Sequence, residues 1–171
     1  TSSVGITLPT KSGSRFEGYY TEKNGGGTLK ISSYGYLADF ESTDYGQDVT
    51  LYAHWSGYGT PSTPTILSKY ATSSGTVRTG EWANKNLLLE ISGGGISSGV
   101  GSSQLQYSYD TSTWYNYTKS ISCTEQTSWK PIYARSVNSS DKSKVSGIAT
   151  HVIRLDTEAP KVYVDFYTGV N

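Results

Sequence analysis

The sequence predicts an all-β fold, and two features of composition and one of pattern carry that prediction. The 171 residues include 15 Tyr and 19 Gly. Tyr favours strands, whereas Gly favours the tight turns between strands. Apolar and polar residues alternate over short segments, and no long stretch repeats at the helical period of about 3.6 residues. We therefore expect a small sheet module followed by a β-sandwich.

A segment rich in Gly and Pro divides the chain. Residues 57–64 contain Pro61 and Pro64 and show no apolar periodicity, which is typical of a linker. Because Gly bends a chain and Pro stiffens it, we expect a joint of limited freedom. The predicted parts are a sheet module over 1–56, the linker over 57–64, a β-sandwich over 65–157, and a last segment over 158–171 that begins a further repeat or forms an edge strand.

Two strands define the first module. In the closing strand, over 50–55, alternation places Trp55 on one face and His54 on the other. We interpret Trp55 as a core anchor rather than a platform for a ligand. An earlier strand segment over 13–22 carries three residues that alternation places on a common face: Phe16, Gly18 and Tyr20.

The first module resembles a known bacterial family. Four segments carry the likeness in order: Leu8-Pro9-Thr10, Gly13 to Thr21, Gly25 to Thr28, and Thr50 to Trp55. Together they resemble the Listeria–Bacteroides repeat, also called the internalin B-repeat. Ser14 and Tyr19 depart from its pattern, which has Tyr and Trp there, and the family's opening hairpin does not precede Pro9. The resemblance implies a β-grasp-like sheet that is only partly represented. Either the sequence starts inside the repeat, or the module is a shortened form.

The second module shows evenly spaced strand candidates. Alternating apolar positions occur near 87–91, 105–109, 114–117, 121–123, 132–137 and 149–155. Short strands separated by turns about every ten residues predict a β-sandwich.

Three motifs of this module resemble a bacterial Ig-like repeat. They are Tyr107 to Asp110 with Trp114 and Tyr117, Ile132 to Asn138, and Ile153 to Pro160. The resemblance implies an Ig-like β-sandwich of the kind found in modular Gram-positive surface proteins. The motif residues are core and turn positions, so they do not indicate a ligand.

Charge and targeting signals limit the expected partners and the expected location of the protein. Fourteen basic residues balance 14 acidic ones, which argues against a nucleic-acid partner. The sequence lacks an apolar run of about 18 residues, which is the length that would predict insertion into a membrane. The sequence contains no Met, and we expect an internal piece of a longer chain whose flanking domains are natural partners. We predict an extracellular location, at the bacterial cell surface or cell wall or in secreted form.

The sequence gives no pattern typical of an enzyme, a metal site or a cofactor site. Catalytic nucleophiles need a nearby base, and the two histidines are His54, in a terminal strand, and His151, on an apolar face. Cys123 follows an apolar alternation and is interpreted as a small buried residue. The acidic residues between Asp39 and Asp48 lack the spacing of a known Ca²⁺ loop and are expected to form a solvated face.

A cluster of aromatic residues is the one candidate binding site. Exposed aromatic rings stack on sugars or anchor protein partners. The same residues are also compatible with a core and ordinary strand positions. The candidate residues are Tyr107, Tyr109, Trp114, Tyr115 and Tyr117.

These observations predict a non-catalytic stalk and adhesion module of a modular bacterial surface protein. Its expected partner is a host or cell-surface protein or a glycan. The alternative is an accessory carbohydrate-binding region of a secreted polysaccharide-degrading enzyme. A carbohydrate module should expose two or three of the candidate rings in one plane, whereas a stalk should bury Trp114.

Overall fold

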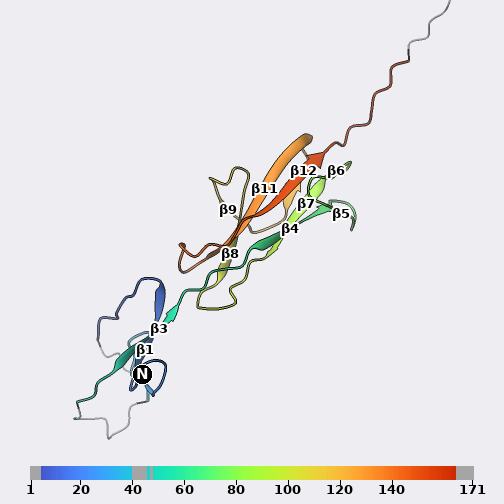
Figure 1. Ribbon diagram of the computed structural model, residues 1–171. Helices are drawn as coiled ribbons and strands as arrows, with labels where there is room; N and C mark the ends of the chain where they lie inside the picture. Colours follow the sequence, from blue (N-terminus) through green and yellow to red (C-terminus); the bar gives the residue numbers. More distant parts are fainter. Residues whose placement is uncertain (1–4, 40–45, 47, 165–171) are drawn as a thin grey trace, which may run out of the picture. The chain divides into compact units, whose positions relative to one another are not determined.

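The computed structural model describes residues 5–39, 46 and 48–164 (Figure 1). Every secondary-structure element among these residues is a β-strand, which confirms the all-β prediction. The chain divides into two compact units. The first comprises the described residues of Thr1–Pro64, Gly93–Leu105 and Arg135–Gly147, and the second those of Thr65–Ser92, Gln106–Ala134 and Ile148–Asn171.

A three-stranded antiparallel sheet forms the start of the first unit. Its strands are β1 (Ser14–Tyr20), β2 (Leu29–Ser32) and β3 (Tyr52–Gly57), in the order β2-β1-β3. Phe16 and Ile31 are its buried apolar side chains. The predicted strands around Phe16 and Trp55 are therefore present.

A bulge in β1 changes which side chains share a face. The register with β3 shifts between Phe16 and Gly18, so two residues of β1 occupy one step of the pairing. The ring of Phe16 consequently contacts Tyr19, with centroids 5.1 Å apart, while Tyr20 stacks on His54. The expectation that Phe16 and Tyr20 share a face is wrong because simple alternation does not survive a bulge.

Gly18 is the residue that permits this bulge. Its φ of +136° lies in the region that favours glycine. A Cβ at this position would lie 2.5 Å from Leu29 Cδ1 and 2.7 Å from the carbonyl oxygen of Ile31. The close approach of β2 therefore requires a residue without a side chain.

The segment expected to be a linker is hydrogen-bonded within the first unit. β3 runs to Gly57, and the next strand begins at Pro64. Between them, the Gly59 N–H donates to Val100 O at 3.0 Å and the Ser62 N–H donates to Gly95 O at 2.9 Å. The backbone of this segment is thus fixed by the 93–105 segment.

Two further sheets contain the remaining strands. The four-stranded sheet has the order β10-β7-β4-β5, and the five-stranded sheet has the order β6-β12-β11-β8-β9. Their bounds are β4 (Pro64–Tyr70), β5 (Thr76–Val77), β6 (Trp82–Ala83), β7 (Leu87–Gly93), β8 (Ser103–Ser108), β9 (Tyr115–Asn116), β10 (Ile121–Cys123), β11 (Thr127–Asn138) and β12 (Ala149–Leu155).

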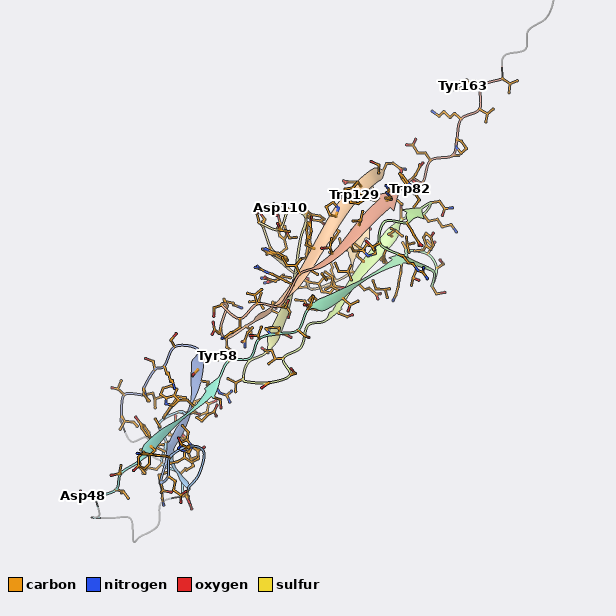
Figure 2. All side chains as sticks on the ribbon, viewed as in Figure 1. Asp48, Tyr58, Trp82, Asp110, Trp129 and Tyr163 are labelled. Carbon is orange, nitrogen blue, oxygen red and sulfur yellow. The ribbon has the colours of Figure 1, made fainter. Side chains whose placement is uncertain are left out.

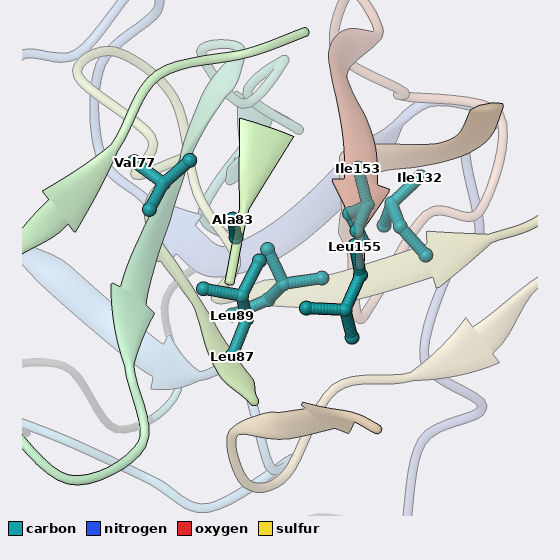
Figure 3. Close-up of a cluster of buried hydrophobic side chains, with 7 residues drawn as sticks. All are labelled: Val77, Ala83, Leu87, Leu89, Ile132, Ile153 and Leu155. Atoms are coloured by element: carbon teal, nitrogen blue, oxygen red, sulfur yellow. The ribbon is translucent and has the colours of Figure 1, made fainter. Parts of the chain in front are cut away.

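The core of the second unit lies between these two sheets (Figure 3). Leu87 and Leu89 point into it from β7, and Ile153 and Leu155 point into it from β12. Val77, Ala83 and Ile132 complete the cluster. Such two-layer packing is what alternating strands produce when each sheet buries one face. The Ig-like topology stays a prediction.

The last described residues extend beyond β12. Residues 158–164 form no strand, and 165–171 lie outside the described residues. The further repeat and the edge strand considered for 158–171 both stay predictions. The described part of the chain has no helix of the length and hydrophobicity needed to cross a membrane.

Candidate functional site

The five aromatic residues singled out in the sequence do not form one flat surface. The Tyr107 ring lies 5.8 Å from that of Tyr109 at an interplanar angle of 88°. It lies 5.4 Å from the Tyr115 ring at 32°. Tyr109 and Tyr115 are exposed, whereas Tyr107, Trp114 and Tyr117 are half-buried. The ring planes diverge too much for one sugar-stacking platform.

A side-chain-capped turn holds Trp114 in place. Its indole Nε1–H donates to the Thr111 carbonyl oxygen at 3.0 Å. The Asp110 carboxylate accepts the backbone N–H groups of Ser112 and Thr113, each at 2.8 Å. Hydrogen bonds from Thr113 and Ser112, together with one from the Ser108 hydroxyl, lower the pKa of Asp110. Trp114 is therefore engaged in the turn, and a binding role for these five residues stays a prediction.

A different group of side chains lies together in the second unit: two exposed tryptophans and the half-buried Arg154. Arg154 on β12 lies opposite Trp82 in the parallel pairing of β12 with β6. Its guanidinium lies 5.4 Å from the centroid of the Trp82 ring and 5.6 Å from that of Trp129, so it contacts both indoles. We call these three residues the Trp–Arg–Trp row, and Figure 2 labels its two tryptophans.

The strands explain how the row forms. β12 pairs with β11 on one side and with β6 on the other. The register between β11 and β12 shifts between Thr127 and Lys130, in the stretch that contains Trp129. The Arg154 Nε–H donates to the Ser128 carbonyl oxygen at 3.1 Å, which fixes the guanidinium beside that stretch. Three strands thus place one residue each in the row.

A shallow pocket of about 320 Å³ adjoins Trp82. Gln126 forms one of its walls and makes two hydrogen bonds with Thr157. The amide Nε2–H donates to Thr157 Oγ1 at 2.6 Å, and Oε1 accepts the Thr157 N–H at 3.0 Å. The carboxylates of Asp156 and Glu158, on either side of Thr157, also line the pocket. The row is therefore bordered by polar groups held in fixed positions.

Two of the groups considered for catalysis, His151 and Cys123, are covered by neighbouring residues to different extents. His151 is 6% exposed, and burial lowers its pKa. Burial raises the pKa of the half-buried Cys123 thiol, which disfavours the reactive thiolate. No group of three or more His, Cys, Asp and Glu suited to a metal ion occurs among the residues that the structure describes. Glu41 and Asp44, of the acidic segment, lie outside them.

Reasoning from the sequence missed both tryptophans of the row. Trp82 follows Gly80-Glu81, and Trp129 lies between Ser128 and Lys130. An indole surrounded by polar residues, with no apolar alternation, is the signal that would have marked each one as exposed. Their closeness to Arg154 had no local signal, because it depends on the pairing of β6 with β12.

Comparisons with known proteins place the chain in no family. No family model, no curated protein and no solved structure matches it.

Proposed function

We propose that the chain is a non-catalytic part of an extracellular, modular bacterial surface protein, and that it acts as a spacer and adhesion module. The contact surface in this proposal is the Trp–Arg–Trp row. The partner is a protein or glycan on a cell surface. The bacterial and extracellular setting rests on the resemblance of the two modules to surface-protein repeats.

The exposure of the two indoles is the observation that carries this proposal. Trp82 is 54% exposed and Trp129 is 62% exposed. Covering about 100 Å² of each ring would contribute roughly 2.5 kcal/mol per ring to binding. Trp and Arg are also the residue types that most often dominate the energy of protein interfaces. A row of both types on one sheet therefore suits adhesion.

The arrangement of the tyrosines favours adhesion over the alternative of an accessory carbohydrate-binding region. Tyr107 and Tyr109 are nearly perpendicular, and the indole of Trp114 is held by its own turn. A flat stacking surface at these residues would have supported the alternative.

Beads coated with the 171-residue chain provide the test. We expect them to adhere to cultured epithelial cells or to purified bacterial cell walls more than uncoated beads do. The double variant Trp82→Ala/Trp129→Ala should lose most of this adhesion. Tyr163→Ala is the matched control, because Tyr163 is 86% exposed and lies outside the row.

Circular dichroism should show that the double variant keeps its strands, because both indoles are largely exposed. Adhesion by the double variant equal to that of the unchanged chain would overturn the proposal. Adhesion to neither surface would also count against it.

A further inference from the structure

A second cavity lies in the first unit, on the three-stranded sheet. It has a volume of about 570 Å³, which is within the range of small-molecule sites. None of its residues belongs to the Trp–Arg–Trp row. Its walls combine charged, amide, hydroxyl and aromatic side chains, among them Lys11, Glu17, Tyr20, Asn24, His54 and Ser56.

Glu17 supplies a carboxylate that is ionised and held in place. Arg15 Nε–H donates to its Oε1 at 2.9 Å. The hydrogen bond from Arg15, followed by one from Ser56, lowers the pKa of Glu17 against the opposing effect of burial. The bulge of β1 occurs at this residue. A carboxylate held in this way accepts hydrogen bonds from the hydroxyl groups of a ligand.

Tyr20 and His54 form one wall of the cavity as a stacked pair, in which the outward face of one ring is open to a ligand. Their rings lie 4.0 Å apart and are nearly parallel, at 6°. His54 Nε2 lies 2.7 Å from the carbonyl oxygen of Glu22. The carbonyl can only accept, so Nε2–H donates and fixes the imidazole. An aromatic surface that cannot rotate away suits the C–H face of a pyranose ring.

The cavity wall carries one positive and one negative side chain, Lys11 and Glu17. The Lys11 ammonium lies 5.8 Å from the centroid of the Trp55 ring, and both residues line the cavity with Glu17. An anionic ligand would meet the Glu17 carboxylate, and a cationic ligand would meet Lys11. Asn24, at a turn with φ of +58°, offers both a donor and an acceptor. A neutral ligand rich in hydroxyl groups satisfies all of these groups.

We infer that this cavity binds a short neutral saccharide. The Tyr20–His54 wall contacts the apolar face of one sugar ring. Glu17 accepts hydrogen bonds from its hydroxyl groups, and Asn24 both donates to them and accepts from them. The site goes beyond the proposed adhesion surface and does not depend on it.

An array of neutral and acidic glycans, probed with the whole 171-residue chain, tests the inference. We expect neutral glycans to give the strongest signals. Titration with the strongest neutral glycan should then show about tenfold weaker binding for Tyr20→Ala and for Glu17→Gln, which is about 1.4 kcal/mol. Tyr36→Ala is the matched control in the same unit, because Tyr36 is 45% exposed and is not part of the cavity wall.

Trp82→Ala separates this site from the adhesion surface, and it should leave glycan affinity within about twofold of the unchanged chain. If Tyr20→Ala does not fold, Glu17→Gln decides, because it keeps the size of the side chain. The inference is overturned if no neutral glycan binds, if acidic glycans bind best, or if Glu17→Gln binds as tightly as Tyr36→Ala.

Discussion

Burial sets the protonation state of His151. This residue lies on β12 opposite Ile132 and is almost completely covered. Removing water from an imidazole disfavours its charged form, so its pKa falls below the ordinary value of 6.5. The unfolded chain therefore binds a proton more readily than the folded one, and folding stability depends on pH.

We expect the free energy of unfolding to fall as the pH drops below about 6.5, the ordinary pKa of histidine. This contribution to stability is complete above that pH and is lost as the pH falls toward the lowered pKa of the folded state. Urea unfolding between about pH 7.5 and pH 5 measures it. His151→Gln should flatten the dependence in that window, and an equally steep fall in that variant would show that other groups cause it.

The positions of single residues were predictable where alternation is unbroken. His151 shares its face with Ile153 and Leu155, and all three are buried. Tyr20 was assigned to the face of Phe16, which is wrong because a bulge adds one residue to the strand. A glycine in a strand hints at such a bulge, but the sequence does not show that β2 approaches Gly18 closely enough to require one.

At the level of the elements, one side chain adds to the backbone hydrogen bonds that hold the segment between β3 and β4. Asn138, at the end of β11, is fully buried. Its Nδ2 donates to the carbonyl oxygens of Gly59 at 2.8 Å and Val100 at 3.0 Å. Its Oδ1 accepts the Ser140 N–H at 2.9 Å. One amide thus joins three parts of the first unit.

Asn138→Ala should reduce the free energy of unfolding by about 3 kcal/mol, because it removes the hydrogen bonds of the amide and leaves the carbonyl oxygen of the buried Gly59 without this donor. Amide hydrogen exchange of Gly59 should also accelerate. Asn116→Ala is the control. Asn116 is exposed and its Oδ1 accepts one bond from Gln106, so we expect a change within about 0.5 kcal/mol. Equal stability of the two variants would contradict the role assigned to Asn138.

The sequence indicated where the strands lie better than it indicated which strands pair with one another. Alternation located the strands that contain Leu87, Ile132 and Ile153, because each buries one face. The pairing of β6 with β12 joins residues far apart in the chain, and no local pattern encodes it. The Trp–Arg–Trp row depends on that pairing, which is why the site was missed while the fold class was predicted.

For the chain as a whole, the two proposals place binding on exposed surfaces. The row in the second unit offers large aromatic area, which suits a macromolecular partner. The cavity of the first unit offers fixed hydrogen-bonding groups, which suit a small polar ligand. Composition and alternation together correctly indicated an all-β chain, but neither surface follows from them, since each combines side chains from separate strands.

Hydroxyl-radical footprinting of the chain bound to epithelial cells or bacterial cell walls tests the adhesion surface most directly. The oxidation rates of the tryptophans are compared between the bound and the free chain. We predict that Trp82 and Trp129 become protected on binding, while Trp114, which is held in its own turn, changes little. Unchanged oxidation of Trp82 and Trp129 in the bound chain would contradict the assignment of the Trp–Arg–Trp row as the contact surface.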